Sequence, residues 1–318
     1  MRISNFILLS LTVLVIGCKD KKAEQFTALP FPDVVVPSMI QDRSEAAEYL
    51  AEHWWDELTD LQRSYPCDST LVSGVSRGDV EQKFANWTVV LSAVDHTVAV
   101  KSMNRLFARV VACERKDTTS NVFESLTSIV QKYLYDPNSP MRNEDFYGPY
   151  VTNLSQCEFV DEAMRQAYAF DAKMCSLNKV GTKAADFRFS DIHGKINSLY
   201  DIDAEYVLLF FSNPGCAACL DIINSLKSFP QVSNGIESGM LAVLNIYIDE
   251  DLEAWKEYMP IYPEEWYNGY DPYYVIRTDV LYNVRAIPSL YLLDKDKKVI
   301  MKDVPESLIF DWINTLSY

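Results

Sequence analysis

Hydrophobic residues in the first half of the chain recur every three or four positions, which is the spacing of amphipathic helices. The first such set follows a polar start at Asp42, and no alternating strand pattern of any length interrupts the run. Residues 38–176 are therefore predicted to form an all-helical domain. The sets are Ala47, Leu50, Trp54, Leu58 and Leu61; Val80, Phe84, Trp87, Leu91 and Val94; Met103, Leu106, Val110 and Cys113; Phe123, Leu126, Ile129, Val130 and Tyr133; and Val160, Ala163, Ala167, Phe170 and Met174.

The pattern changes to short apolar strands after residue 177. A predicted hairpin at 186–199 precedes two continuous apolar runs, at 206–211 and 240–248, which are typical of strands buried on both faces of a sheet. The aromatic, proline-bearing stretch 258–274 is interpreted as an irregular insertion. The order β-β-β-α-β-α-β-β-α predicts an α/β sandwich over residues 177–318, with a central mixed sheet flanked by helices. Its last three elements are a hairpin at 289–304 and a closing amphipathic helix at 308–316.

The N-terminal segment has the features of an export signal. Arg2 precedes an apolar run at 7–16 that is too short to span a bilayer as a mature helix. Leu14-Val15-Ile16-Gly17-Cys18 then resembles the lipobox of bacterial lipoproteins, which implies cleavage before Cys18 and acylation of that cysteine. Residues 1–17 would be the signal peptide and 18–37 a lipidated tether, with the fold held outside the cytoplasm, facing the periplasm. The alternative is an uncleaved signal anchor.

The length and the net charge of the chain limit the kinds of partner that it can bind. The chain has 318 residues, of which 48% are hydrophobic, and a formal net charge of −16. This length accommodates two domains of ordinary size. The negative charge argues against nucleic acid as a partner, because phosphate binding needs clustered Lys and Arg. It also disfavours electrostatic attachment to anionic lipid headgroups.

The strongest chemical signal is a pair of cysteines after the buried strand at 206–211. Pro214-Gly215 forms a turn, and a helix is predicted to begin at Cys216. Free N–H groups and the helix dipole at such a position favour the thiolate over the thiol. Cys219 lies one helical turn further on, close enough to form a disulfide with Cys216. The arrangement predicts a dithiol redox site whose pair is its own redox group, with no other cofactor and no metal.

At this point residues 179–318 resemble the thioredoxin superfamily, and within it the TlpA/ResA-like thiol–disulfide oxidoreductases. The likeness rests on the CxxC pair after a buried strand, on the run 283–288 before the strand 289–294, and on the N-terminal hairpin. It implies that Pro288 is cis and lies against the dithiol, and that the Ile287 backbone hydrogen-bonds to an extended substrate segment.

The same resemblance implies protein thiols and disulfides as substrates. Cys216 would be the attacking thiolate and Cys219 the resolving one. It favours the direction of reduction, fed by a membrane electron donor. The stretch 49–56 likewise resembles the uncharacterised domain that precedes thioredoxin-like domains in some bacterial lipoproteins, which implies no known activity.

Three positions depart from the family pattern. Gly215 replaces the usual Trp before the first cysteine, which is expected to open the substrate-binding side of the site, and Ala218 replaces a frequent Pro. Phe210 stands where thioredoxins carry a buried acid that helps the second cysteine ionise. Proton removal from Cys219 therefore has no assigned base.

Other chemistries fit less well. A non-catalytic partner-binding lipoprotein, with a structural disulfide on a thioredoxin scaffold, is the main alternative. A peroxidase of this fold needs Thr where Asn213 stands, haem attachment needs His where Leu220 stands, and zinc needs four clustered ligands. The remaining cysteines permit one or two structural bridges whose pairing the sequence leaves open, namely Cys67, Cys113, Cys157 and Cys175.

Overall fold

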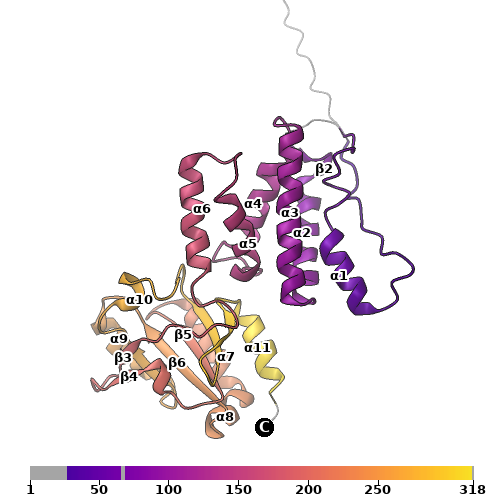
Figure 1. Ribbon diagram of the computed structural model, residues 1–318. Coiled ribbons are helices and arrows are strands. Elements are labelled where there is room, and N and C mark those ends of the chain that lie inside the picture. The colour runs from indigo at the N-terminus through magenta and orange to yellow at the C-terminus, as the bar shows by residue number, and fades with distance from the viewer. Residues whose placement is uncertain (1–26, 66–68, 317–318) are drawn as a thin grey trace, which may run out of the picture.

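The computed structural model describes residues 27–65 and 69–316. The predicted signal peptide, the lipidation site Cys18 and Cys67 lie outside the described residues. Figure 1 shows a helical half stacked on an α/β half, joined by the segment that follows α6. Within the described ranges, no helix combines the length and the apolar character that crossing a membrane requires.

Six helices build the described part of the first half, one more than the five that the sequence pattern predicts. Five of the six helix starts carry a side-chain cap, from Asp42, Ser76, Asp95, Asn143 and Asp161, which satisfies backbone N–H groups that have no partner within the helix. The helices are α1 (Arg43–His53), α2 (Arg77–Ser92), α3 (His96–Lys116), α4 (Val122–Leu134), α5 (Glu144–Leu154) and α6 (Glu162–Cys175).

The helices enclose one hydrophobic core, in which Trp55, Phe84 and Trp87 pack edge to face or tilted against one another. Three details differ from the sequence-based prediction. The first helix ends at His53, and a small hairpin of β1 (Leu71–Val72) and β2 (Val75–Ser76) precedes α2, so the domain is not wholly helical. Helix α5 was also not predicted, since Gly148 and Pro149 within it disfavour a helix.

The second half is a seven-stranded mixed sheet in the order β4-β3-β7-β6-β5-β8-β9. Strands β5, β6 and β7 run parallel, and β8 lies antiparallel to β5 on the other side. The strands are β3 (Arg188–Ser190), β4 (Ile196–Ser198), β5 (Tyr206–Phe211), β6 (Leu241–Tyr247), β7 (Tyr267–Tyr270), β8 (Ser289–Asp294) and β9 (Val299–Lys302). The helical elements are η1 (Leu199–Asp201), α7 (Ala217–Ser228), α8 (Pro230–Glu237), α9 (Leu252–Tyr258), η2 (Met259–Ile261), α10 (Val275–Thr278) and α11 (Glu306–Asn314).

Side chains of β5 alternate between two cores, one on each face of the sheet. Val207, Leu209 and Phe211 belong to the core to which η1 and α10 contribute, whereas Leu208 and Phe210 belong to the core beneath α7 and α11. A strand buried on both faces loses the polar alternation of a half-exposed strand, which explains the continuous apolar run in the sequence.

The interpretation of 258–274 as an irregular insertion is wrong. This stretch contains η2 and β7, and β7 pairs in parallel with β6 inside the sheet. Its Gly269 packs so closely on Phe189 that a Cβ there would lie 2.6 Å from the Phe189 ring. Close packing thus selected a residue that weakens the strand signal in the sequence.

Candidate thiol–disulfide site

The two cysteines lie where β5 meets α7. Cys216 is the N-cap of α7, and its Sγ accepts a hydrogen bond from the backbone N–H of Cys219 at 3.1 Å. A sulfur at this position faces the positive end of the helix dipole, which stabilises a thiolate. The end of β5 therefore positions the turn, and the N-terminus of α7 favours the thiolate form of Cys216.

Cys216 and Cys219 form a disulfide, with their Cα atoms 5.2 Å apart. The two sulfurs differ in access, since Cys216 is half-buried whereas Cys219 is fully buried within the core beneath α7. After reduction, a bulky disulfide substrate can approach Cys216 but not Cys219. The order of attack expected from the sequence requires this difference in access and stays a prediction.

The segment before β8 borders the same site. The Ile287–Pro288 peptide is cis, and the Ile287 carbonyl oxygen lies 4.0 Å from the Cys216 Sγ. Sheet register explains this proximity, because Ser289, the first residue of β8, pairs with Phe211, the last residue of β5. The structure thus brings the predicted substrate-binding residues Ile287 and Pro288 beside the dithiol.

Gly215 occupies the turn immediately before Cys216 and is exposed. Its φ of +73° lies in the left-handed region, which residues with a Cβ adopt at a cost. No atom lies within 4 Å of a Cβ built there, so the backbone angle and not space selects glycine. The exposed Gly215 therefore leaves the adjoining side of Cys216 without a side chain to cover it.

The sequence did not single out a polar cluster that flanks the turn. Asn213 Nδ2 donates to Asp249 Oδ2 at 2.6 Å, and Arg277 forms an ion pair with the same carboxylate. Asp249 follows β6, and the carboxyl ends of the parallel strands β5 and β6 meet at one edge of the sheet. An acid directly after a buried strand is the signal that could have identified this cluster.

Among the described residues, no carboxylate hydrogen-bonds to either cysteine of the pair. Phe210, at the position of the expected buried acid, is fully buried in the same core as Cys219, and Asp221, the carboxylate nearest to Cys219 in the sequence, is exposed. A buried polar chain lies nearby instead, in which Ser212 Oγ donates to Asn245 Oδ1, and Asn245 Nδ2 donates to Asn268 at 3.1 Å. These groups are neutral amides and a hydroxyl, and they order the strand ends without supplying a base.

The other described cysteines are free thiols away from the dithiol. Cys157 and Cys175 are buried, and Cys113 is half-buried. Burial raises the pKa of the Cys113 and Cys175 thiols, which lowers their thiolate fraction and hence their reactivity. Across the described ranges, no three His, Cys, Asp or Glu side chains form a cluster that could hold a metal ion.

Comparison with known families assigns both halves of the chain. Residues 203–299 match a family described as Thioredoxin-like, and residues 16–178 match the family described as Domain of unknown function (DUF5106). Among curated proteins, none matches this chain. The α/β half thus defines the class, a thioredoxin-like protein whose CxxC pair forms a disulfide.

Comparison with solved structures finds one match over nearly the whole chain and further matches over less than half of it. A thioredoxin-like protein from Bacteroides caccae is 33% identical with a TM-score of 0.78, and the match covers 92% of this chain and all of the other. The C-terminal domain of an uncharacterized Bacteroides fragilis protein is 43% identical over 43% of this chain and 98% of its own, with a TM-score of 0.42. A domain of a possible thiol-disulfide isomerase from Cytophaga hutchinsonii is 23% identical over 44% of this chain and 93% of its own, with a TM-score of 0.38.

The DUF5106 match spans just over half of the chain, and the Bacteroides caccae protein matches nearly all of it. The protein belongs to the DUF5106 family, with a thioredoxin-like domain at its C-terminal end.

Proposed function

We propose that this protein is an extracytoplasmic thiol–disulfide oxidoreductase that reduces disulfides of protein partners. The observation that carries the proposal is the half-buried Cys216 at the start of α7, disulfide-bonded to the fully buried Cys219 and bordered by the cis Ile287–Pro288 peptide. One half-buried sulfur, one fully buried sulfur and an adjacent backbone segment at Ile287–Pro288 meet the needs of exchange with a protein disulfide.

The reaction proceeds in two displacements. The Cys216 thiolate attacks one sulfur of the partner's disulfide, which forms a mixed disulfide and releases the first partner thiolate. The Cys219 thiolate then attacks the Cys216 sulfur, which releases the second partner thiolate and leaves the Cys216–Cys219 pair oxidised. The partner gains two electrons, and a dithiol donor at the membrane returns the pair to its reduced form.

Access decides which cysteine carries the first step. Because Cys219 is fully buried, it reaches only the Cys216 sulfur, three residues away on the same helix. The missing base beside Cys219 affects the second step, since its thiol must lose a proton before it attacks. We therefore expect resolution, not capture, to limit turnover at neutral pH.

The proposed location outside the cytoplasm rests on residues 1–17 as a signal peptide and on Cys18 as the lipidation site. Cleavage before Cys18 and acylation of its thiol would tether the domains outside the cytoplasm through residues 18–37. Mass spectrometry of the mature wild-type chain should find Cys18 as its N-terminal residue, with an acyl group on its thiol. An uncleaved chain or an unacylated Cys18 would contradict the lipid anchor.

Insulin reduction tests the activity. The wild-type chain with dithiothreitol should accelerate insulin precipitation, and Cys216→Ser should lower the rate to that of dithiothreitol alone. Equilibration with glutathione buffers tests the direction, since a potential below that of the glutathione pool indicates a reductase. A wild type no faster than dithiothreitol alone would favour a partner-binding protein with a structural disulfide.

A further inference from the structure

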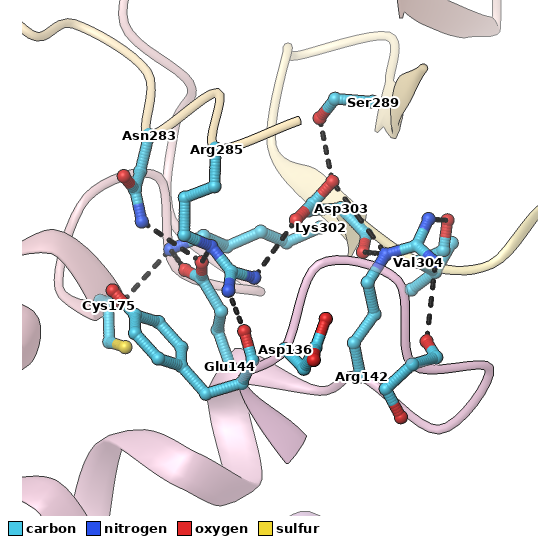
Figure 2. Close-up of polar contacts among 12 residues, drawn as sticks. Asp136, Arg142, Glu144, Cys175, Asn283, Arg285, Ser289, Lys302, Asp303 and Val304 are labelled. Atoms are coloured by element: carbon cyan, nitrogen blue, oxygen red, sulfur yellow. Dashed lines mark hydrogen bonds and ion pairs between the residues drawn. The ribbon is translucent and has the colours of Figure 1, made fainter. Parts of the chain in front are cut away.

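The loop before Pro288 is tied to the helical domain by its own side chains. Arg285 extends out of the thioredoxin-like domain, and its Nε lies 3.1 Å from Glu144 Oε1 at the start of α5. Its guanidinium also donates to the Tyr135 carbonyl and lies 4.1 Å from the centre of the Tyr135 ring. Asn283 Nδ2 donates to the same Glu144 oxygen at 3.1 Å (Figure 2).

Glu144 is the centre of this interface. Its side chain is 2% exposed and forms an ion pair at 2.7 Å with Lys302, whose side chain is 1% exposed. Lys302, at the end of β9, also donates to the carbonyls of Cys175 and Leu177, where α6 ends and the connection between the domains begins. One carboxylate of the helical domain thus holds both the loop before β8 and the end of β9.

Ser289, the residue after Pro288, is held in place through Asp303. Ser289 Oγ donates to Asp303 Oδ1 at 2.8 Å, and Asp303 Oδ2 lies 3.2 Å from Arg285 Nη2. Arg142 of the helical domain donates to the backbone carbonyls of Asp303 and Val304, each at 2.9 Å (Figure 2). The segment from Arg285 to Ser289 is therefore fixed at both ends by groups that the helical domain supplies or orients.

These contacts are charged and buried, which makes them specific. Three cations, Arg142, Arg285 and Lys302, surround the carboxylates of Glu144 and Asp303. Removal of one partner from such a network leaves a buried charge uncompensated, so the arrangement tolerates little displacement. Because the Ile287 carbonyl oxygen lies 4.0 Å from the Cys216 Sγ, a shift of the loop alters the edge of the thiol site.

We propose that the helical domain positions the substrate-binding loop of the thiol site, with Glu144 and Arg285 as the positioning residues. The inference rests on the proposed function, because it assigns to the helical domain a role in the recognition of protein disulfides. A protein substrate lies along the Ile287–Pro288 backbone and depends on the loop. A small disulfide needs only the Cys216 sulfur and does not.

The test compares two substrates and one activity-independent readout in the full chain. Glu144→Gln should lower kcat/KM for insulin about tenfold or more, chiefly through KM, whereas exchange with 5,5′-dithiobis(2-nitrobenzoate) should change less than about twofold. Arg285→Lys keeps the charge and should fall between the wild type and Glu144→Gln. Hydrogen exchange of the peptide covering residues 279–289 should become faster in Glu144→Gln.

Asp56→Asn is the matched control. It also removes one carboxylate charge from ion pairs with arginines, Arg105 and Arg109, but it lies between α1 and α3, away from the loop. It should leave both the insulin selectivity and the exchange of 279–289 as in the wild type. Unchanged exchange in Glu144→Gln, or an equal loss with both disulfides, would overturn the inference. A wild type inactive toward both disulfides would instead overturn the proposed function, while the exchange data still decide whether Glu144 holds the loop.

Discussion

At the scale of single residues, the turn before Cys216 depends on backbone angle more than on space. Gly215 has a positive φ and open surroundings, so a methyl group there meets no atom but must adopt a left-handed conformation. Glycine at this position is therefore a structural requirement of the turn, and it leaves the adjoining side of Cys216 uncovered.

Gly215→Ala should destabilise the oxidised protein by about 1–2 kcal/mol, because residues with a Cβ pay that cost in the left-handed region. Gly78→Ala is the control, since Gly78 lies in α2 with open space and no positive φ, and it should be neutral or stabilising by up to about 1 kcal/mol. Urea unfolding measures both. Equal effects of the two substitutions would refute the role of backbone angle.

At the scale of elements, α1 is joined to α3 by an ionic cluster around Asp56. Its carboxylate lies 2.7 Å from both Arg105 Nη2 and His53 Nδ1, and 3.3 Å from Arg109 Nε. Burial raises the pKa of Asp56, but the hydrogen bonds from Arg105 and His53 and the charges of Arg109 and Arg105 lower it more, so the net pKa lies below its ordinary value.

Because the pKa of Asp56 is lowered, its contribution to the stability of the fold should be lost at acid pH. A carboxyl with a depressed folded-state pKa stabilises the fold above its ordinary pKa of 3.8, and this stabilisation is lost as the pH falls through the folded-state value. Asp56→Asn should therefore cost about 1–2 kcal/mol at neutral pH and progressively less below about pH 4. Urea unfolding across that range measures the difference. A gap between wild type and variant that stays constant at acid pH would disagree with this account.

The sequence predicts those elements whose burial is visible in their own hydrophobic pattern. The strands β5 and β6 are buried on both faces, so each is a continuous apolar run in the sequence. The site at Cys216 and Cys219 could be predicted because these cysteines directly follow such a strand. Helix α5 and strand β7 were missed because tertiary contacts override local preference. In α5, Tyr147, Tyr150 and Val151 are fully buried and hold a helix that contains Pro149, and in β7 Gly269 accommodates Phe189.

At the scale of the whole molecule, the two halves have separate hydrophobic cores but share a buried ionic interface. No sequence pattern could reveal this interface, since Glu144, Arg285 and Lys302 are isolated charged residues far apart in the chain. Only the folded arrangement brings them together, and this contact links the family's uncharacterised domain to the thiol site.

Lys302→Met should destabilise the protein by about 3 kcal/mol or more, because it leaves the buried Glu144 with one cation fewer. It should also separate the unfolding of the two halves into distinct transitions, seen as non-coincident fluorescence and circular dichroism curves in urea. Lys132→Met is the control, since Lys132 pairs with Glu81 at the exposed surface and should cost less than about 1 kcal/mol. A Lys302→Met variant as stable as Lys132→Met would show that the interface contributes little.

The central claim is that Cys216 exchanges disulfides with protein partners, and the most direct measurement is capture of the mixed disulfide. In a Cys219→Ser chain the resolving thiol is absent, so reaction with a disulfide-bonded protein such as insulin should stop at a covalent adduct. Mass spectrometry of the digested adduct should place the bond at Cys216, and dithiothreitol should release it. No adduct at Cys216, together with no insulin reduction by the wild type, would contradict the account.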